Sequence, residues 1–579
     1  MDRREFLTAK RKVPSQVSFS PAVNKTSTGS GLAPYTGNWG IYEIVHLLSR
    51  TMFGSKKADI DYFKTKSMSA AVDELLNPTA PLPSPPVKEY ATSTTTGVVA
   101  DAHIAVGDVW VNDSSTDGTV NSQRRSSFKR WWTGVMINQD RSLREKMTLF
   151  WANHFGTQTA AMNYAHFVYK HHSLLRQHAL GNFRNLIRQV TLDGGMLIFL
   201  NGKDSNGATN STPNENYARE LQELYTLGKE NTPNYTEDDV KAAARVLSGW
   251  QLNVAANTWP YFTPSRHDKT NKQFSSFYNN TVITGRSTNP AGTSAGEQEI
   301  EDLLTMIFNK KVEVSQFIVK KLYRWFCYYQ IDSDVQANVI DPLAKILRDS
   351  NWDIKPVLSV LFKSEHFFDS AYRGCMIKSP VDIVVSAARE FNLAITDANY
   401  GAVTPSLTDT YASWEYLRGQ TSSFNQDIGE PPNVQGWAAY YQVPQYHELW
   451  IGVDTLPKRN KLTDLLIGAT GYTVNGTNKY YMKINPVAFT ASLPNPSNPI
   501  NLINDTLDIF LKVSLSDASK LTIKNQILLK GQITDQYWTD AWNAYLASPA
   551  VTGTPYKTVL AILQSLYKYF MNLAEYQLC

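Results

Sequence analysis

Hydrophobic residues recur at steps of three and four along most of the chain, which is the pattern of amphipathic helices. One such stripe consists of Ile41, Ile44, Val45, Leu48 and Met52. A second stripe follows from Ile318 to Tyr329, and a last apolar helix is expected between Thr558 and Leu578. Runs in which apolar and polar residues strictly alternate are few. The pattern therefore predicts an all-α, mostly helical protein with long polar loops and few short strands.

Changes in polarity divide the chain into three parts. Residues 1–39 are polar, and we expect a flexible N-terminal tail. Residues 40–465 are expected to form the main helical domain, with a Ser/Thr/Pro-rich surface insertion at 78–127 and a polar loop at 251–298. Residues 466–579 are expected to form a C-terminal helical extension packed on the main domain, and its Tyr- and Asn-rich beginning to form a short hairpin or an irregular loop.

Composition excludes several classes of protein. The 579 residues include 42% hydrophobic and 19% charged ones, which excludes disorder over most of the chain. The net charge of +4 argues against nucleic acid as a partner, because such binding needs a concentrated excess of cations. Only 3 Cys occur, which excludes a disulfide scaffold and a cysteine-rich zinc fold. No apolar run is long enough for a transmembrane segment.

The first residues, Met1 to Leu7, resemble the head of a twin-arginine export signal. The apolar region that should follow is replaced by a polar stretch with three basic residues. The sequence therefore leaves two compartments open, cytoplasmic or exported.

The segment 213–228 is the most informative for chemistry. Asn214 is a good N-cap and Gly228 a good stop, which predicts one helix of about four turns. Glu220 and Glu223 lie on one stripe of this helix, together with Asn216, at the border of its apolar face. Carboxylates so placed can share a divalent metal ion or divide into acid and base. The alternative is that they form ion pairs with arginines or accept hydrogen bonds from backbone groups.

Two further segments carry candidate groups. His154 lies on the apolar face of a helix predicted to end near Phe155, where an imidazole is either a satisfied core residue or a functional one. His267 and Asp268 follow Arg266 in the polar loop and suit proton transfer or ligand binding. The possible metal ligands are His154, Glu220 and Glu223.

Several motifs resemble, in the same order, those of a large bacterial family known as domain of unknown function 1800. They are Phe150–Phe155 (FWANHF), Arg176–Phe183 (RQHALGNF), Asn214–Gly228 (NENYARELQELYTLG), Gly249–Trp250, His267–Asp268 and Glu430–Trp437 (EPPNVQGW). The resemblance covers about residues 41–578. It implies a helical fold and a frequent genomic neighbour that is phosphatase-like or sulfatase-like, but no established reaction.

Two hypotheses follow. The first is a hydrolase, with or without one divalent metal ion, whose catalytic groups meet in one cleft; they are His154, Glu220, Glu223, His267 and Asp268. Its substrate would be bound by Asn216, Arg266 and Trp437, and the abundant Trp and Tyr make a glycan a plausible substrate. The second is a non-catalytic binding or assembly protein that partners the phosphatase-like or sulfatase-like protein, with the motifs in structural roles.

Overall fold

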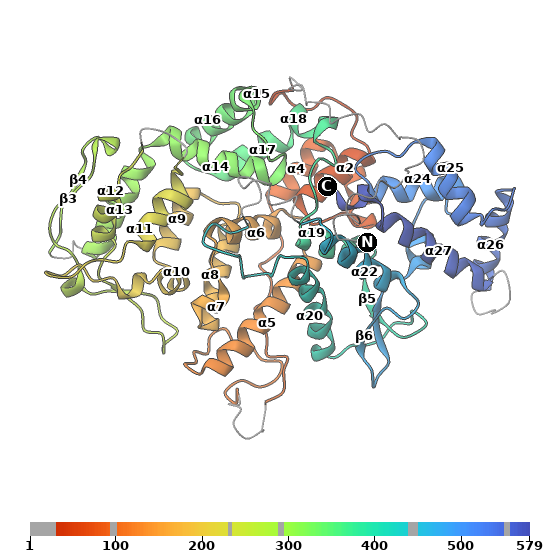
Figure 1. Ribbon diagram of the computed structural model, residues 1–579, viewed down its shortest axis with the longest axis horizontal. Helices are drawn as coiled ribbons and strands as arrows, with labels where there is room; N and C mark the ends of the chain where they lie inside the picture. The colour runs from red at the N-terminus through yellow and green to blue at the C-terminus, as the bar shows by residue number, and fades with distance from the viewer. Residues whose placement is uncertain (1–29, 93–100, 230–233, 288–293, 438–449, 549–555) are drawn as a thin grey trace, which may run out of the picture.

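The computed structural model describes residues 30–92, 101–229, 234–287, 294–437, 450–548 and 556–579 (Figure 1). The twin-arginine-like head and most of the expected tail lie outside these residues. The last part of that tail is packed on the protein, because the backbone N–H of Tyr35 donates to Lys363 O over 2.7 Å.

The described residues are mostly helical, which confirms the predicted fold class. The first third of the chain contains α2 (Ile41–Thr51), α3 (Lys57–Lys64), α4 (Met68–Leu76), α5 (Gly118–Ile137), α6 (Arg144–Phe155), α7 (Thr159–Met162), α8 (Ala165–Gln177), α9 (Phe183–Thr191), α10 (Gly194–Phe199) and the 3₁₀ turn η1 (Gly202–Asp204). Side chains of Asn182 and Asp193 cap the starts of α9 and α10.

The middle of the chain continues in the same manner. It contains α11 (Asn216–Glu220), η2 (Leu221–Thr226), α12 (Glu237–Val246), η3 (Pro264–Arg266), η4 (Ser276–Tyr278), α13 (Ala295–Phe308), α14 (Lys311–Phe326), α15 (Ser333–Val335), η5 (Gln336–Ile340), α16 (Asp341–Asp349), α17 (Ile354–Phe362), α18 (Glu365–Phe368), η6 (Ser370–Tyr372), α19 (Pro380–Glu390) and α20 (Leu407–Ser423). The predicted stripe from Ile318 falls on α14 as far as Phe326, and Ile318, Leu322 and Phe326 are buried. Tyr329, its last expected member, lies beyond the end of the helix.

The last part holds α22 (Thr455–Ile467), α23 (Pro486–Ala491), α24 (Pro499–Phe510), α25 (Asp517–Ile523), η7 (Lys524–Leu528), α26 (Gln536–Ala547), α27 (Tyr556–Met571) and η8 (Ala574–Gln577). In Figure 1, α24, α25, α26 and α27 lie at one end of the molecule, and α12 and α13 lie near the opposite end. Helix α6 lies between them and packs against α8 and η2.

The strands are short. Antiparallel pairs join β1 (Trp250–Gln251) to β2 (Tyr261–Phe262) and β3 (Lys272–Gln273) to β4 (Val282–Ile283), so the loop at 251–298 is built from small hairpins. A three-stranded sheet has the order β5 (Ala394–Thr396), β7 (Tyr480–Lys483), β6 (Tyr472–Asn475). The sheet thereby pairs a strand from the expected main domain with the hairpin that begins the expected extension.

The segment expected to be a surface insertion is partly internal. Helix α5 begins inside it, and the ring of Trp110 is fully buried. Arg124 is also buried, and its guanidinium is 2.7 Å from both Asp101 and Asp113. The polar composition suggested a solvated loop, but these polar side chains satisfy one another inside the fold. Residues 93–100 of this segment lie outside the described part.

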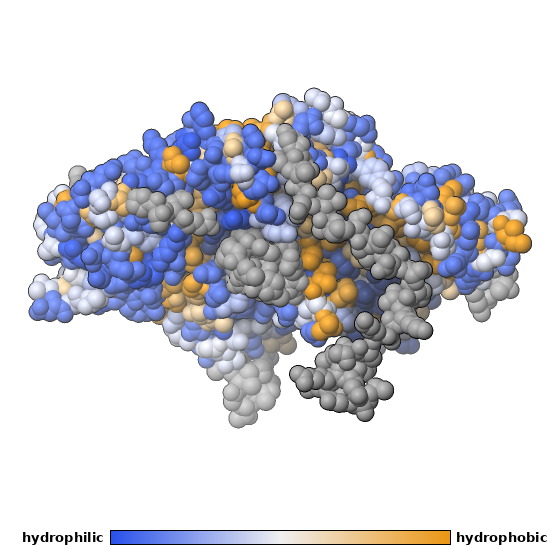
Figure 2. Space-filling model, turned by 45° about the horizontal axis from the view of Figure 1, so that its top comes forward, coloured by the Kyte–Doolittle hydropathy of each residue, from blue (hydrophilic) through white to orange (hydrophobic). Residues whose placement is uncertain are grey.

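One cluster of buried hydrophobic residues extends from Ile44 to Tyr576. Figure 2 shows a mainly hydrophilic face, with hydrophobic residues gathered near the middle of the molecule. Over the described residues, no helix has both the length and the apolar character that crossing a membrane requires.

Candidate functional site

The predicted helix at 214–228 ends as expected before Gly228, but it begins at Asn216 with Glu215 and not Asn214 as its N-cap, and it is not one α-helix. The Asn214 side chain accepts the backbone N–H of Asn216 over 2.9 Å, and Gly228 adopts a left-handed φ of 74°. Between them, α11 passes into the π-helical turn η2, in which the N–H of Leu227 bonds to Gln222 O. The Gln222 side chain accepts the buried Tyr278 hydroxyl over 2.6 Å, a tertiary contact that the local sequence does not reveal.

Glu220 and Glu223 lie half-buried on this segment. Glu223 is 2.7 Å from Lys229, whereas no described residue forms a hydrogen bond or ion pair with Glu220. Burial and the neighbouring Glu223 carboxylate raise the pKa of Glu220. The hydroxyl of Tyr235 is buried close by and forms no hydrogen bond with a described residue, and burial and Glu223 raise its pKa too. The two carboxyl groups therefore have different environments, as an acid and a base require.

His154 faces the backbone of η2 and not the two carboxylates. Its Nε2 lies 3.2 Å from Tyr225 O, and its Nδ1 lies 3.3 Å from Lys321 Nζ. Lys321 also donates to Leu224 O over 3.1 Å. Burial and the Lys321 charge hold the pKa of His154 well below its usual range, so the imidazole is neutral. Among the described residues, no hydrogen bond or ion pair joins His154 to Glu220 or Glu223.

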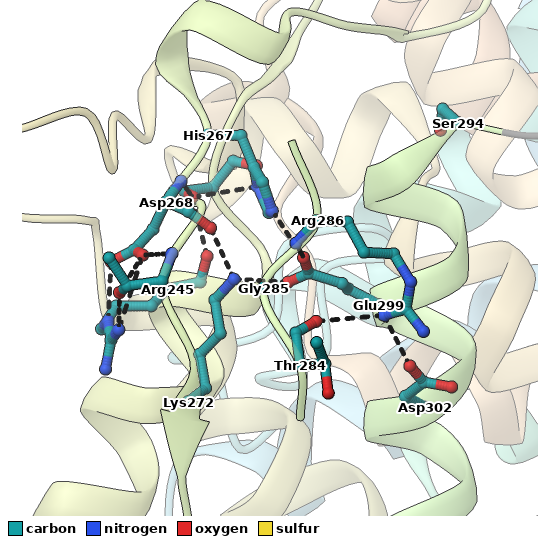
Figure 3. A network of polar contacts seen from close by, with 12 residues as sticks. Arg245, His267, Asp268, Lys272, Thr284, Gly285, Arg286, Ser294, Glu299 and Asp302 are labelled. Carbon is teal, nitrogen blue, oxygen red and sulfur yellow. Dashed lines mark hydrogen bonds and ion pairs between the residues drawn. The ribbon is translucent and has the colours of Figure 1, made fainter. Parts of the chain in front are cut away.

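His267 belongs to a separate, buried network (Figure 3). Its Nδ1 lies 2.9 Å from Ser248 O, and its Nε2 lies 3.1 Å from Glu299 Oε1. Glu299 Oε2 is 2.6 Å from Lys272 Nζ, and both of these side chains are 0% exposed. The network fastens the loop at 251–298 to α13, which carries Glu299.

Asp268 faces away from His267 toward Arg245 (Figure 3), whose Nε is 2.7 Å from Asp268 Oδ2. Burial raises the pKa of Asp268, but hydrogen bonds from Arg245 and Thr270 outweigh burial and lower it to about 2. Arg266, which was expected to bind substrate, donates to the backbone oxygen of Asp204 over 3.1 Å. The structure therefore places the expected catalytic residues in two groups, one around η2 and one around α13.

The expected divalent metal ion does not fit the described residues. No group of three or more His, Cys, Asp and Glu side chains among them is arranged to hold a metal ion. His154, Glu220 and Glu223 are kept apart because the imidazole bonds to the backbone of η2.

A chain of hydroxyl, imidazole and carboxylate lies at the end of α6. Helix α6 ends at Gly156, whose φ is 55°, and the next residue directs its hydroxyl to α8: Thr157 Oγ1 lies 3.2 Å from His171 Nε2. His171 Nδ1 lies 2.8 Å from Asp193 Oδ2. The same Asp193 oxygen accepts the N–H of Met196 at the start of α10, which fixes the carboxylate. All three members of the chain are buried.

Sequence reasoning missed this triad, because its members belong to three separate elements. A signal was present in part: Asp193 precedes Gly194-Gly195 at a helix start, and His171 lies on a predicted helix. Nothing in the spacing showed that the two helices place these side chains in contact.

A cavity of about 20 Å³ adjoins the triad. It is lined by Phe128, Trp132, Ala152, Thr157, Thr159, Met162, Val168, His171, His172, Leu175, Gly429, Pro431 and Trp437. Trp437, expected to bind substrate, is 5% exposed, and its backbone N–H donates to Asn153 Oδ1 over 2.6 Å. The motif 430–437 thus closes the cavity against the end of α6. The motif can approach the end of α6 closely because Gly156 has no side chain. A Cβ at this position would lie 2.2 Å from Val434 O.

The family model described as "Protein of unknown function (DUF1800)" matches residues 46–578. The search of curated proteins and the search of solved structures found no match.

Proposed function

The chain belongs to the DUF1800 family of proteins of unknown function, and we propose that it is a hydrolase in which His171 is the general base for the Thr157 hydroxyl. The observation that carries this proposal is the Thr157–His171–Asp193 chain, with contacts of 3.2 and 2.8 Å. Both lie within or close to hydrogen-bond reach, which is the geometric requirement for a nucleophile, its base and the group that orients the base.

The mechanism follows from the proton positions. With Nδ1–H donating to Asp193, the Nε2 lone pair of His171 is free to take the hydroxyl proton of Thr157. Thr157 Oγ1 then attacks the carbonyl carbon of an ester, and the leaving alcohol takes the proton from Nε2. A water molecule, deprotonated by the same nitrogen, attacks the acyl-threonine and releases a carboxylic acid, and Oγ1 of Thr157 regains its proton.

The cavity limits the substrate. A volume of about 20 Å³ holds a single water molecule, so only a small acyl group such as acetyl can be accommodated with little rearrangement. Its walls include Trp132, Met162 and Leu175, which suit a methyl group. The glycan expected from the sequence would be the alcohol part of the ester and would remain outside. Entry requires the wall at 429–437 to move, and the left-handed Gly429 and Gly436 at its ends suit such a movement.

Hydrolysis of a chromogenic acetate ester by the full chain tests this proposal. We expect Thr157→Val and His171→Ala to lower kcat/KM by about 10²–10⁴-fold, because each removes a member of the proton path. Thr157→Ser should retain most activity. Thr148→Val is the matched control, because Thr148 lies on α6 and bonds only to Arg144 O. Full activity of Thr157→Val would refute the proposal.

The expected pair Glu220 and Glu223 is a second acid–base arrangement for the same class of reaction. It is favoured by the unpartnered Glu220 carboxyl with its raised pKa, which suits a proton donor to a glycosidic oxygen. Glu220→Gln and Glu223→Gln, assayed on a panel of glycosides alongside the acetate ester, separate the two sites. Loss of glycoside turnover with intact ester turnover would assign the chemistry to the glutamates.

A binding or assembly role is favoured by a different observation. His154, His267 and Asp268 are all engaged in internal contacts, as structural motif residues would be. The partner suggested by the family resemblance is a phosphatase-like or sulfatase-like protein. Capture of such a partner by the full chain, together with no turnover of either substrate panel, would decide for this role.

A further inference from the structure

The protein contains a buried arginine that no described carboxylate neutralises. Arg50 on α2 is 3% exposed, and no described Asp or Glu is within ion-pair distance of it. Its guanidinium donates to Met376 Sδ over 2.8 Å, to Tyr372 O over 3.1 Å and to Cys375 Sγ over 3.4 Å. Its Nε–H has no acceptor. A buried charge of this kind is costly unless a counter-ion is present.

Arg50 lines a cavity of about 50 Å³, which has room for roughly three or four water molecules. The other lining residues are Ser49, Lys146, Arg324, Trp325, Tyr329, Met376, Ile377, Ser379, Asp382, Trp450 and Cys579. They come from α2, α6, α14 and the start of α19 with its preceding loop, and from three positions outside these segments, Tyr329, Trp450 and Cys579. Lys146 stands on the first turn of α6, whereas Thr157 follows its last turn, so this cavity is separate from the triad.

The polar groups of this cavity are mainly donors and cations. Lys146 and Arg324 line the cavity beside Arg50, and Lys146 is in contact with Asp382, the one Asp or Glu side chain among the described lining residues. The indole Nε1–H of Trp325 is buried and meets no acceptor among the described residues. Since the remaining walls are largely apolar, a charge–charge interaction inside is stronger than at the surface.

Further cations lie behind the cavity. Lys378 is 2% exposed, and its Nζ has no hydrogen-bond partner and is 4.0 Å from Glu390. Lys512 is also buried, and burial together with Lys378 lowers its pKa to about 7. Lys378 and Arg50 both lower the pKa of Lys512, so like charges lie close together behind the cavity, and an anion there would relieve their repulsion.

We propose that this cavity binds a small oxyanion, such as a sulfate, phosphate or carboxylate group, through Arg50, Lys146 and the Trp325 indole. This inference is independent of the proposed hydrolase. Burial opposes the Arg50 charge, but Cys579, Cys375 and Cys327 outweigh burial and raise the pKa of Arg50. These residues, of which Cys375 contacts Arg50, are therefore the source of negative charge that competes with a bound anion.

Isothermal titration of the full chain with sulfate, phosphate and acetate, at constant ionic strength held with chloride, tests the proposal. We expect saturable binding of at least one of these ions. Trp325→Phe should weaken it about tenfold, because one donor to a charged acceptor is lost while the charge is unchanged. Arg50→Lys should weaken it by at least as much, because the guanidinium fork is lost. Cys375→Ser should leave it unchanged.

The matched controls are Trp39→Phe and Arg141→Lys. The indole of Trp39 donates to Phe63 O outside the cavity, and Arg141 pairs with Asp59. Trp325→Phe keeps the test decisive if Arg50→Lys does not fold. Preference for sulfate or phosphate indicates a tetrahedral group, and preference for acetate a carboxylate. Equal affinity of the wild type, Trp325→Phe and Arg50→Lys would overturn the proposal, as would binding lost in Cys375→Ser or absent for all three ions.

Discussion

Replacement of Lys272 by Met tests whether the His267 network is structural. Lys272 donates to Glu299 over 2.6 Å and to Asp268 O over 2.5 Å, with no solvent reaching its side chain. Removing one partner of a buried ion pair costs about 3–5 kcal/mol. Glu299 would keep His267 Nε2 at 3.1 Å and the Arg286 N–H at 2.8 Å, which compensate in part. We therefore expect a loss of about 2–4 kcal/mol in the free energy of unfolding.

The effect also has a predicted pH dependence. In the wild type, burial opposes ionisation of Glu299, but His267 and Lys272 outweigh burial and lower its pKa. Without Lys272, the folded-state pKa of Glu299 rises above its unfolded value. The unfolded chain then loses this proton at a lower pH than the folded chain, so the penalty is complete near neutral pH. It shrinks as the pH falls toward about 4, where Glu299 becomes protonated in both states.

Urea unfolding, followed by tryptophan fluorescence between about pH 4 and 7, measures both the loss of stability and its pH dependence. Each should appear as a shift in the urea concentration at the midpoint, with an unchanged dependence of the unfolding free energy on urea concentration. Lys241→Met is the matched control, because Lys241 is 59% exposed and solvent screens its pair with Asp238, so its loss should leave the midpoint nearly unchanged. A loss below about 1 kcal/mol for Lys272→Met would refute the reasoning. A pH-independent loss would show that the cost does not arise from the Glu299 charge.

Two further changes give expected outcomes. Gly436→Ala should lower stability by about 1–3 kcal/mol in thermal unfolding and should also reduce ester turnover. The reason is that the φ of Gly436 is 76° and the new Cβ would lie 2.2 Å from a backbone oxygen of α6. Wild-type stability of this variant would contradict the prediction. Lys512 is buried near Lys378, Arg50 and Glu390, and its pKa is lowered to about 7. Between about pH 7 and 10, the folded state therefore binds fewer protons than the unfolded state. Wild-type stability should therefore rise by about 2–4 kcal/mol over this range, and Lys512→Met should abolish the rise; an unchanged slope in urea titrations at several pH values would contradict the assignment.

Local patterns predicted the helices well. The stripe that begins at Ile41 forms α2, and the stripe from Ile318 forms α14. Of the two options for the start of the expected extension, the structure has the hairpin β6–β7. The helix expected at 214–228 was wrong in its second half, because Tyr278 bonds to the side chain of Gln222 and the backbone adopts a π-helical turn. Such a deviation depends on a residue far away in the sequence.

The candidate residues were found more easily than their partners. Sequence reasoning selected His154 and His267 because ionisable groups on apolar faces and in motifs are unusual. It could not show that His154 meets Lys321 and the backbone of η2, or that His267 meets Glu299. Whether an imidazole is a ligand, a base or a structural donor depends on those partners.

By itself, the sequence determined the secondary structure class, the family and the supply of chemistry-bearing residues, because periodicity, capping and motifs act over a few neighbouring positions. Only the tertiary structure decided which of these residues meet. Thr157, His171 and Asp193 are separated by 14 and 22 residues and come together because the end of α6, the middle of α8 and the start of α10 pack at one place. Arg50 likewise lines a cavity only when segments that are distant in the sequence enclose it. Contacts of this kind are set by packing of whole faces, which no short stretch of the chain encodes.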